Sequence, residues 1–128
     1  MRKQTMRHIW RSFFLLGAIF VFTFFDWLVH QTSPILEVPS WYFRNKIIFG
    51  TVWACISGFF VLKYSIKIQA AIITIVTVTL LQLRYFFYGY SWEFHAIIFP
   101  AHMILLFASS YLALQLERKM KKKKSKKK

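Results

Sequence analysis

Four apolar stretches, separated by short polar segments, constrain the fold of this chain more than any other feature. They are residues 12–29, 47–62, 68–83 and 94–116. A bilayer core about 30 Å thick requires about 20 helical residues, a length close to that of the first stretch and below that of the last. The two middle stretches, of 16 residues each, rise only about 24 Å as helices and need flanking residues to complete a span. The alternative is that one of these two is re-entrant.

The pattern predicts an all-α integral membrane protein whose single domain, residues 1–117, is a bundle of four transmembrane helices. The expected helices cover about residues 12–30, 46–63, 67–84 and 93–117. The composition supports this prediction, since 57% of the residues are apolar and 20% are aromatic. A soluble domain of this size has too little interior to bury so many apolar and aromatic side chains. We therefore expect lipid to cover part of them.

The basic residues predict the orientation. If the N-terminus is cytoplasmic, the segments 1–11, 63–67 and 117–128 face the cytoplasm and hold 15 basic residues, whereas the opposite side holds three. Those three are Arg44, Lys46 and Arg84. By the positive-inside rule both termini are then cytoplasmic. We expect Lys46 and Arg84 to reach the headgroup region by extending along their helices. The membrane is the endoplasmic reticulum if the source is eukaryotic, where short spans suit a thin bilayer, and the plasma membrane if it is prokaryotic.

The net charge of +14 belongs mainly to the chain ends, because nine of the 18 Lys and Arg residues follow Glu117. A nucleic-acid-binding domain spreads such charge over its folded surface, so we expect no specific nucleic acid partner. Residues 118–128 are predicted to be a disordered polybasic tail. Its lysines are expected to contact anionic lipid headgroups at the cytoplasmic face. They are Lys121, Lys122, Lys123, Lys124, Lys126, Lys127 and Lys128.

Two other roles for this tail stay open. Lys124 and Lys126 stand fifth and third from the end of the sequence, as in dilysine-type retrieval signals of eukaryotic membrane proteins. The positively charged tail could also bind nucleic acid without sequence specificity, because nucleic acid is a polyanion.

Gly50, Ala54 and Gly58 recur at every fourth residue of the second apolar stretch. Such small residues allow two helix backbones to approach closely in lipid. They predict a helix-packing face, either inside the bundle or against another subunit in a homo-oligomer or a larger membrane complex.

Ionisable residues within the apolar stretches are the candidate functional residues, because charge in hydrocarbon is costly. Asp26, His30, His95 and His102 are predicted to lie at one leaflet, as a metal or proton site. Arg84 and Glu93, at the same surface, are supporting candidates. The alternative is an Asp26–Arg84 or Asp26–His pair that only ties helices together. The spacing matches no dedicated metal motif, so the cofactor stays unknown.

Three features of the chain occur together in one known family. They are the acidic Asp26 in the first helix, the aromatic segment Trp41-Tyr42-Phe43 before the second, and the basic C-terminus. In this plan the chain is loosely similar to the EXPERA family of sterol-handling proteins of the endoplasmic reticulum, which have four or five helices. That family also uses His and Glu in its second and third helices, and residues 47–83 contain neither. We therefore do not assign the chain to it.

The sequence contains no Gly-rich phosphate loop and no GxSxG, CxxCH or HExxH motif. The leading prediction is therefore a non-enzymatic accessory or lipid- and partner-binding membrane subunit. One alternative is a metal- or haem-binding redox enzyme that uses the His and Asp residues at the non-cytoplasmic leaflet. The other is a small transporter or channel that uses the same polar residues.

Overall fold

A computed structural model describes residues 2–127 and shows four long α-helices. The helices are α1 (Arg2–His30), α2 (Ser40–Phe60), α3 (Ile66–Phe87) and α4 (Trp92–Lys126), with a 3₁₀ turn, η1, at Pro34–Leu36. The described residues form no strand. The predicted all-helical fold with four helices is confirmed.

Three of the four helices, α1, α3 and α4, are long and apolar enough to cross a membrane. Helix α2 does not reach the same mean hydropathy. Its second turn contains Arg44, Asn45 and Lys46, and these polar residues lower the average over a helix of 21 residues.

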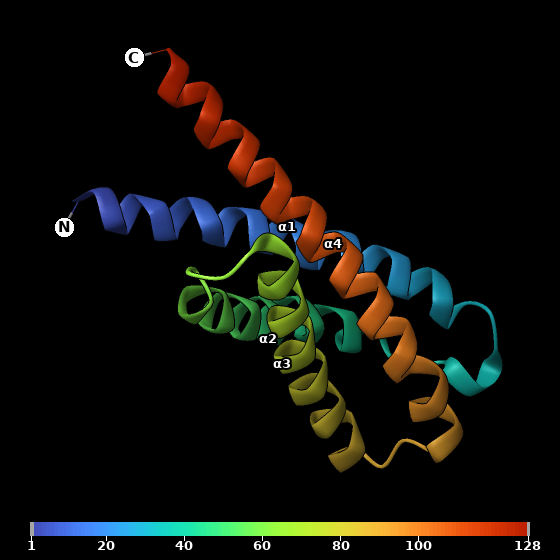
Figure 1. Cartoon of the computed structure of the whole chain (residues 1–128). Coiled ribbons are helices and arrows are strands. Elements are labelled where there is room, and N and C mark those ends of the chain that lie inside the picture. Colours follow the sequence, from blue (N-terminus) through green and yellow to red (C-terminus); the bar gives the residue numbers. More distant parts are fainter. Residues whose placement is uncertain (1, 128) are drawn as a thin grey trace.

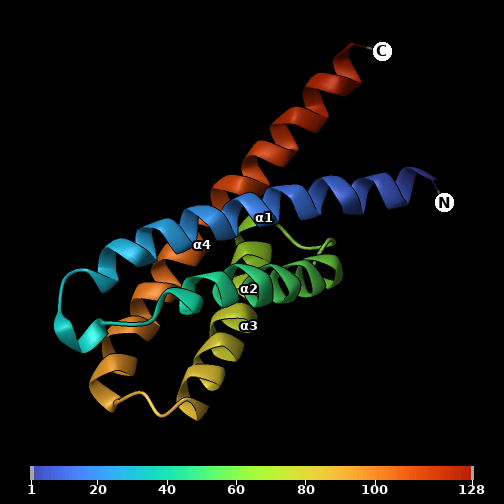
Figure 2. The same ribbon diagram turned by 180° about the vertical axis from the view of Figure 1, so that it is seen from behind.

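Each helix packs against the next along the chain, and α4 closes the ring by packing against α1. Both termini and the α2–α3 connection lie at one end of the bundle, which we call the terminal end (Figures 1 and 2). The connections 31–39 and 88–91 lie at the other end, which we call the loop end. Helices α1 and α4 cross and then move apart toward the termini (Figures 1 and 2).

Local signals explain where the helices begin and end at the loop end. Ser91 caps α4, where its hydroxyl accepts a hydrogen bond from the Phe94 amide at 3.2 Å. The turn before it needs Gly89, whose φ of 80° lies in the left-handed region. Pro39 precedes the first turn of α2, a position that does not require an amide hydrogen.

The helices extend beyond the predicted spans. Helix α1 starts at Arg2 rather than near residue 12, and α2 starts at Ser40 rather than near residue 46. Helix α4 continues to Lys126, whereas we predicted a disordered tail from residue 118. Lysine is a good helix former, and contacts with earlier residues support the extension. Lys121 pairs with Glu117, and Lys124 Nζ lies 4.1 Å from the centroid of the Trp10 ring. The predicted headgroup contact Lys128 lies outside the described residues.

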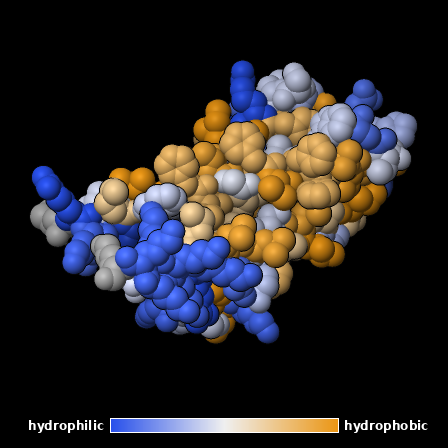
Figure 3. Space-filling view, turned by 90° about the horizontal axis from the view of Figure 1, so that it is seen from above, coloured by the Kyte–Doolittle hydropathy of each residue, from blue (hydrophilic) through white to orange (hydrophobic). Residues whose placement is uncertain are grey.

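The distribution of side chains is inverted relative to a soluble protein. Large apolar side chains such as Phe60, Phe87 and Ile104 are exposed, while the charged side chains of Asp26, Lys46 and Glu117 are buried. Orange apolar atoms cover much of the surface in Figure 3, and blue hydrophilic atoms gather toward the terminal end. A contiguous exposed apolar surface of this kind marks contact with a partner or a membrane.

The small-residue stripe of α2 lies inside the bundle. Gly50, Ala54 and Gly58 are buried. A Cβ atom at Gly50 would lie 3.5 Å from Ile19 of α1, but one at Gly58 would lie only 2.8 Å from the Leu15 Cδ1 atom. The tightest packing over this stripe is therefore at Gly58, against the Leu15 side chain of α1.

We predict that Gly58→Leu lowers the thermal unfolding midpoint in detergent, because a bulky side chain separates α1 from α2. Overpacking of this kind typically costs about 1–3 kcal/mol. Gly17→Leu is the matched control, since nothing lies within 4 Å of a Cβ atom at that position. Equal midpoints for the two variants would show that the α1–α2 contact at Gly58 contributes nothing to stability.

Candidate functional site

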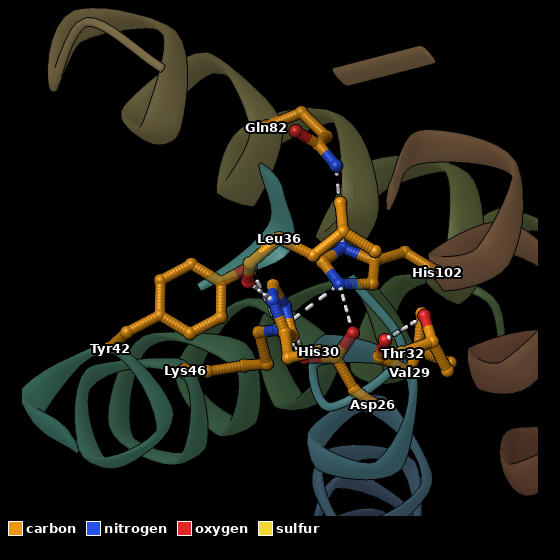
Figure 4. A network of polar contacts seen from close by, with 9 residues as sticks. All are labelled: Asp26, Val29, His30, Thr32, Leu36, Tyr42, Lys46, Gln82 and His102. Carbon is orange, nitrogen blue, oxygen red and sulfur yellow. Dashed lines mark hydrogen bonds and ion pairs between the residues drawn. The ribbon is translucent and has the colours of Figure 1, made fainter. Parts of the chain in front are cut away.

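Four ionisable side chains meet near the loop end of the bundle and form what we call the inner cluster: Asp26, His30, Lys46 and His102 (Figure 4). All four are buried, and Asp26, Lys46 and His102 have no exposed surface. Asp26 and His30 are one turn apart on α1, while Lys46 comes from α2 and His102 from α4. The inner cluster therefore joins three helices.

The Asp26 carboxylate is the common acceptor. Its Oδ1 atom lies 2.7 Å from the His102 Nε2 atom. Its Oδ2 atom accepts a hydrogen bond from the Lys46 ammonium and lies 3.4 Å from the His30 Nε2 atom. Charge-assisted bonds of this kind are the strong ones in a protein interior, so both carboxylate oxygens are satisfied.

The prediction for Lys46 is wrong. We predicted that it extends to the headgroup region, but its side chain is fully buried. Its Nζ atom also lies 3.0 Å from His102 Nε2, 3.2 Å from the Tyr42 hydroxyl and 4.2 Å from the centroid of the Tyr42 ring. A sequence signal did exist, because a carboxylate within a span requires a cation at similar depth, and Lys46 precedes the second apolar stretch directly.

Gln82 extends the inner cluster to α3. Its amide nitrogen lies 3.4 Å from His102 Nδ1, and its carbonyl oxygen lies 3.0 Å from His95 Nδ1. One assignment satisfies the contacts of Gln82: His95 donates to Gln82, Gln82 donates to His102 Nδ1, and His102 donates through Nε2 to Asp26. The Lys46 ammonium and the His102 Nε2–H group are then both donors, and both bond the Asp26 carboxylate. All four helices then contribute to one hydrogen-bond network.

Aromatic rings surround this network. The Phe22 ring packs edge-on against His102 with centroids 5.1 Å apart, and the Tyr42 ring packs against His30 at 4.9 Å. The His30 Nδ1 atom bonds the Leu36 carbonyl of the connection after α1. A cavity of about 360 Å³ is lined by His30, whereas Asp26, Lys46 and His102 have no exposed surface. The centre of the cluster is therefore enclosed.

The structure brings together three of the four predicted principal residues, Asp26, His30 and His102, and links His95 to them through Gln82. The two supporting residues lie elsewhere. Arg84 donates to the Tyr88 hydroxyl at 3.2 Å, and its guanidinium lies 3.9 Å from the centroid of the Phe49 ring. Glu93 is exposed in the first turn of α4, where a carboxylate favours the helix dipole.

The inner cluster has part of the chemistry of a metal site. Asp26, His30 and His102 each offer one ligand atom, and these atoms lie within 4.8 Å of one another. Histidine nitrogen and carboxylate oxygen suit zinc or iron. The Lys46 ammonium contacts the same Asp26 and His102 side chains, so a divalent cation would have to displace it or tolerate its positive charge.

Comparison of the chain with protein-family models, curated proteins and solved structures finds no match.

We predict that Lys46→Met destabilises the bundle strongly, because it leaves the buried Asp26 carboxylate without its ammonium partner. Breaking a buried ion pair in this way costs about 3–5 kcal/mol. Adding Asp26→Asn should recover part of that loss, so the double variant should be more stable than the sum of the single effects, by about 1–3 kcal/mol. The free energy of unfolding in mixed micelles measures this coupling.

Arg84→Met is the matched control for this cycle. It removes one positive charge near the loop end from a residue that contacts Tyr88 and Phe49 and makes no ion pair among the described residues. Combining it with Asp26→Asn should give additive effects. If Lys46 and Asp26 also proved additive, the two residues would not stabilise each other.

Proposed function

We propose that this protein is a multi-pass integral membrane protein in which all four helices cross the bilayer, and that it acts as a non-enzymatic subunit that binds lipid and partner proteins. The observation that carries this proposal is the inverted packing. Phe60 and Phe87 are 80% and 79% exposed, while Asp26 and Lys46 are 0% exposed. In water, exposed aromatic rings and buried charges are both unfavourable. In lipid, the exposed rings are favourable, and the charges must be enclosed and paired.

Helix α2 is proposed as a span despite its lower hydropathy. Lys46 faces the inner cluster rather than lipid, and its charge is compensated by Asp26. Arg44 is exposed one turn after the start of α2, where a long side chain reaches the headgroup region. The mean hydropathy of α2 is lowered by both charges, but only Arg44 would face the membrane.

The proposed orientation places the terminal end in the cytoplasm. The α2–α3 connection and the last turns of α4 meet Arg7 and Arg11 at this end, so most of the basic residues of the described chain gather there. The positive-inside rule then favours a cytoplasmic terminal end. The membrane would be the endoplasmic reticulum of a eukaryote or the plasma membrane of a prokaryote.

The non-enzymatic assignment is supported by the state of the inner cluster. Asp26 is paired with Lys46 and His102 and has no exposed surface. The contact between His95 and His102 runs through the Gln82 amide, which does not gain and lose protons as an imidazole or a carboxylate does. These properties suit a tie between helices better than a proton path or a reaction centre.

The first test is topology. We expect an engineered glycosylation acceptor beside Glu37, in the connection between α1 and α2, to be modified when the protein is made in microsomes. An acceptor after Ser125 should remain unmodified, because the terminal end stays outside the lumen. Glycosylation of the acceptor after Ser125 but not of the one beside Glu37 would overturn the orientation. Glycosylation of both acceptors would overturn the even number of spans.

A metal-binding redox role is the second candidate, favoured by the convergence of Asp26, His30 and His102. We predict that wild-type protein purified without chelator contains no stoichiometric metal by mass spectrometry and shows no visible absorption, because Lys46 supplies the positive charge. Lys46→Met removes that charge, so this variant should bind Co²⁺ more tightly than wild type, as measured by its visible spectrum. Stoichiometric metal in wild type, lost in His102→Leu, would establish the metal site and reject the structural tie.

A further inference from the structure

A cavity of about 570 Å³ opens at the terminal end between α1, the α2–α3 connection and α4. We call it the terminal cavity. Its lining contains six basic side chains and one acidic side chain, Glu117. The basic residues are Arg7, Arg11, Lys63, Arg118, Lys121 and Lys122. This volume is within the range of small-molecule sites, and the charge balance selects an anion.

Two of these cations belong to a buried structural contact. Arg11 is only 4% exposed, donates to the Gln69 carbonyl oxygen and pairs with Glu117 at 3.4 Å. Glu117, 3% exposed, also accepts from Lys121. The single acidic residue of the terminal cavity is therefore already neutralised, and α1, α3 and α4 are fixed around it.

The other four cations have no acidic partner. No ion pair among the described residues involves Arg7, Lys63, Arg118 or Lys122. They converge on one cavity from α1, the α2–α3 connection and α4. Like charges held together repel one another, so an anion in the terminal cavity would relieve this repulsion.

The start of α3 adds to the same potential. Ser65 and Ile66, at its N-terminus, line the terminal cavity, and the Ser65 side chain forms no capping hydrogen bond there. The free amides of a helix N-terminus carry a partial positive charge and bind phosphate groups readily.

An apolar groove lies beside the terminal cavity, between α1 and α4. It measures about 100 Å³, and its lining contains Trp10, Phe14 and Met120 together with Lys124. It shares Glu117 and Lys121 with the terminal cavity. A basic cavity joined to an apolar groove matches a headgroup joined to an acyl chain, whereas a soluble phosphate would use only the basic part.

We propose that the terminal cavity binds the phosphate headgroup of one anionic phospholipid, with its acyl chain along the groove formed by Trp10, Phe14 and Met120. This inference rests on the proposed function, because the lipid must come from the leaflet that surrounds the terminal end. It differs from the general attraction of the lysine-rich C-terminal segment in being a single saturable site. Arg7 and Lys63 hold the phosphate, and the Arg11–Glu117 contact shapes the wall.

The test uses the full chain in neutral detergent micelles, with dioleoyl phosphatidic acid as the probe and native mass spectrometry to count bound lipid. We expect one saturable lipid per protein and no saturable binding of dioleoyl phosphatidylcholine. The variant Arg7→Gln with Lys63→Gln removes two exposed cations of the terminal cavity and leaves the Arg11, Gln69 and Glu117 contacts intact. Each lost cation should weaken binding about fivefold.

The matched control is Lys3→Gln with Lys67→Gln. It removes the same charge from two exposed residues of the terminal end that do not line the terminal cavity. Phosphatidic acid affinity should stay within about twofold of wild type, because exposed charges outside a site are screened by salt. An equal loss in both double variants would show diffuse attraction and overturn the site.

Inorganic pyrophosphate, which has phosphate groups but no acyl chain, is the probe that distinguishes a lipid site from a site for a soluble phosphate. Met120→Ala alters only the groove, so it should weaken phosphatidic acid binding and leave any pyrophosphate binding unchanged. Pyrophosphate that binds as tightly as the lipid, with no effect of Met120→Ala on either ligand, would overturn the assignment to a lipid.

The glycosylation test of topology distinguishes failure of the lipid site from failure of the proposed function. If the protein inserts as proposed but binds phosphatidic acid no better than phosphatidylcholine, only the lipid site fails. If neither acceptor is modified and the protein remains outside the membrane fraction, the proposed function itself fails.

Discussion

The Asp26 carboxylate is the group on which the arrangement of the bundle depends. A charge at a fully buried position costs several kcal/mol unless it is paired and hydrogen-bonded, and Asp26 has no exposed surface. Lys46 of α2 and His102 of α4 supply the partners. Because each partner must reach one carboxylate, the depths of α1, α2 and α4 relative to one another are fixed near the loop end.

A second polar contact performs the same role at the terminal end. Arg11 of α1 bonds Gln69 of α3 and Glu117 of α4. Between the two polar contacts lie fully buried apolar side chains such as Leu15, Ile73 and Leu106. In a lipid environment apolar packing alone gives little preference for one helix register over another. The two buried ionic contacts supply that preference, and close packing at Gly58 completes it.

The number and type of helices could be predicted from the sequence because long apolar runs leave few alternatives. The helix ends could not, since Lys121 and Lys124 are held by Glu117 and Trp10, and such tertiary contacts are invisible in composition. The meeting of Asp26 with His30 and His102 was predicted from their common leaflet and the requirement that buried charge be paired. Arg84 had the same depth but turns outward to Phe49. The position of a residue along its helix can be read from the sequence, whereas the rotation of the helix about its axis depends on packing.

The buried residues at the terminal end escaped prediction for a different reason. Arg11 and Glu117 flank apolar stretches, so each was counted as part of a charged end rather than as a partner across the bundle. Their contact uses the only carboxylate of the terminal cavity and so leaves the remaining cations there uncompensated. The inner cluster is the opposite case, because its charges balance one another and it is enclosed. The ligand site that we propose is therefore at the terminal end, where α1 and α4 move apart (Figures 1 and 2). A phosphate in the terminal cavity would compete with Glu117 for Lys121, while Gln69 keeps Arg11 in position.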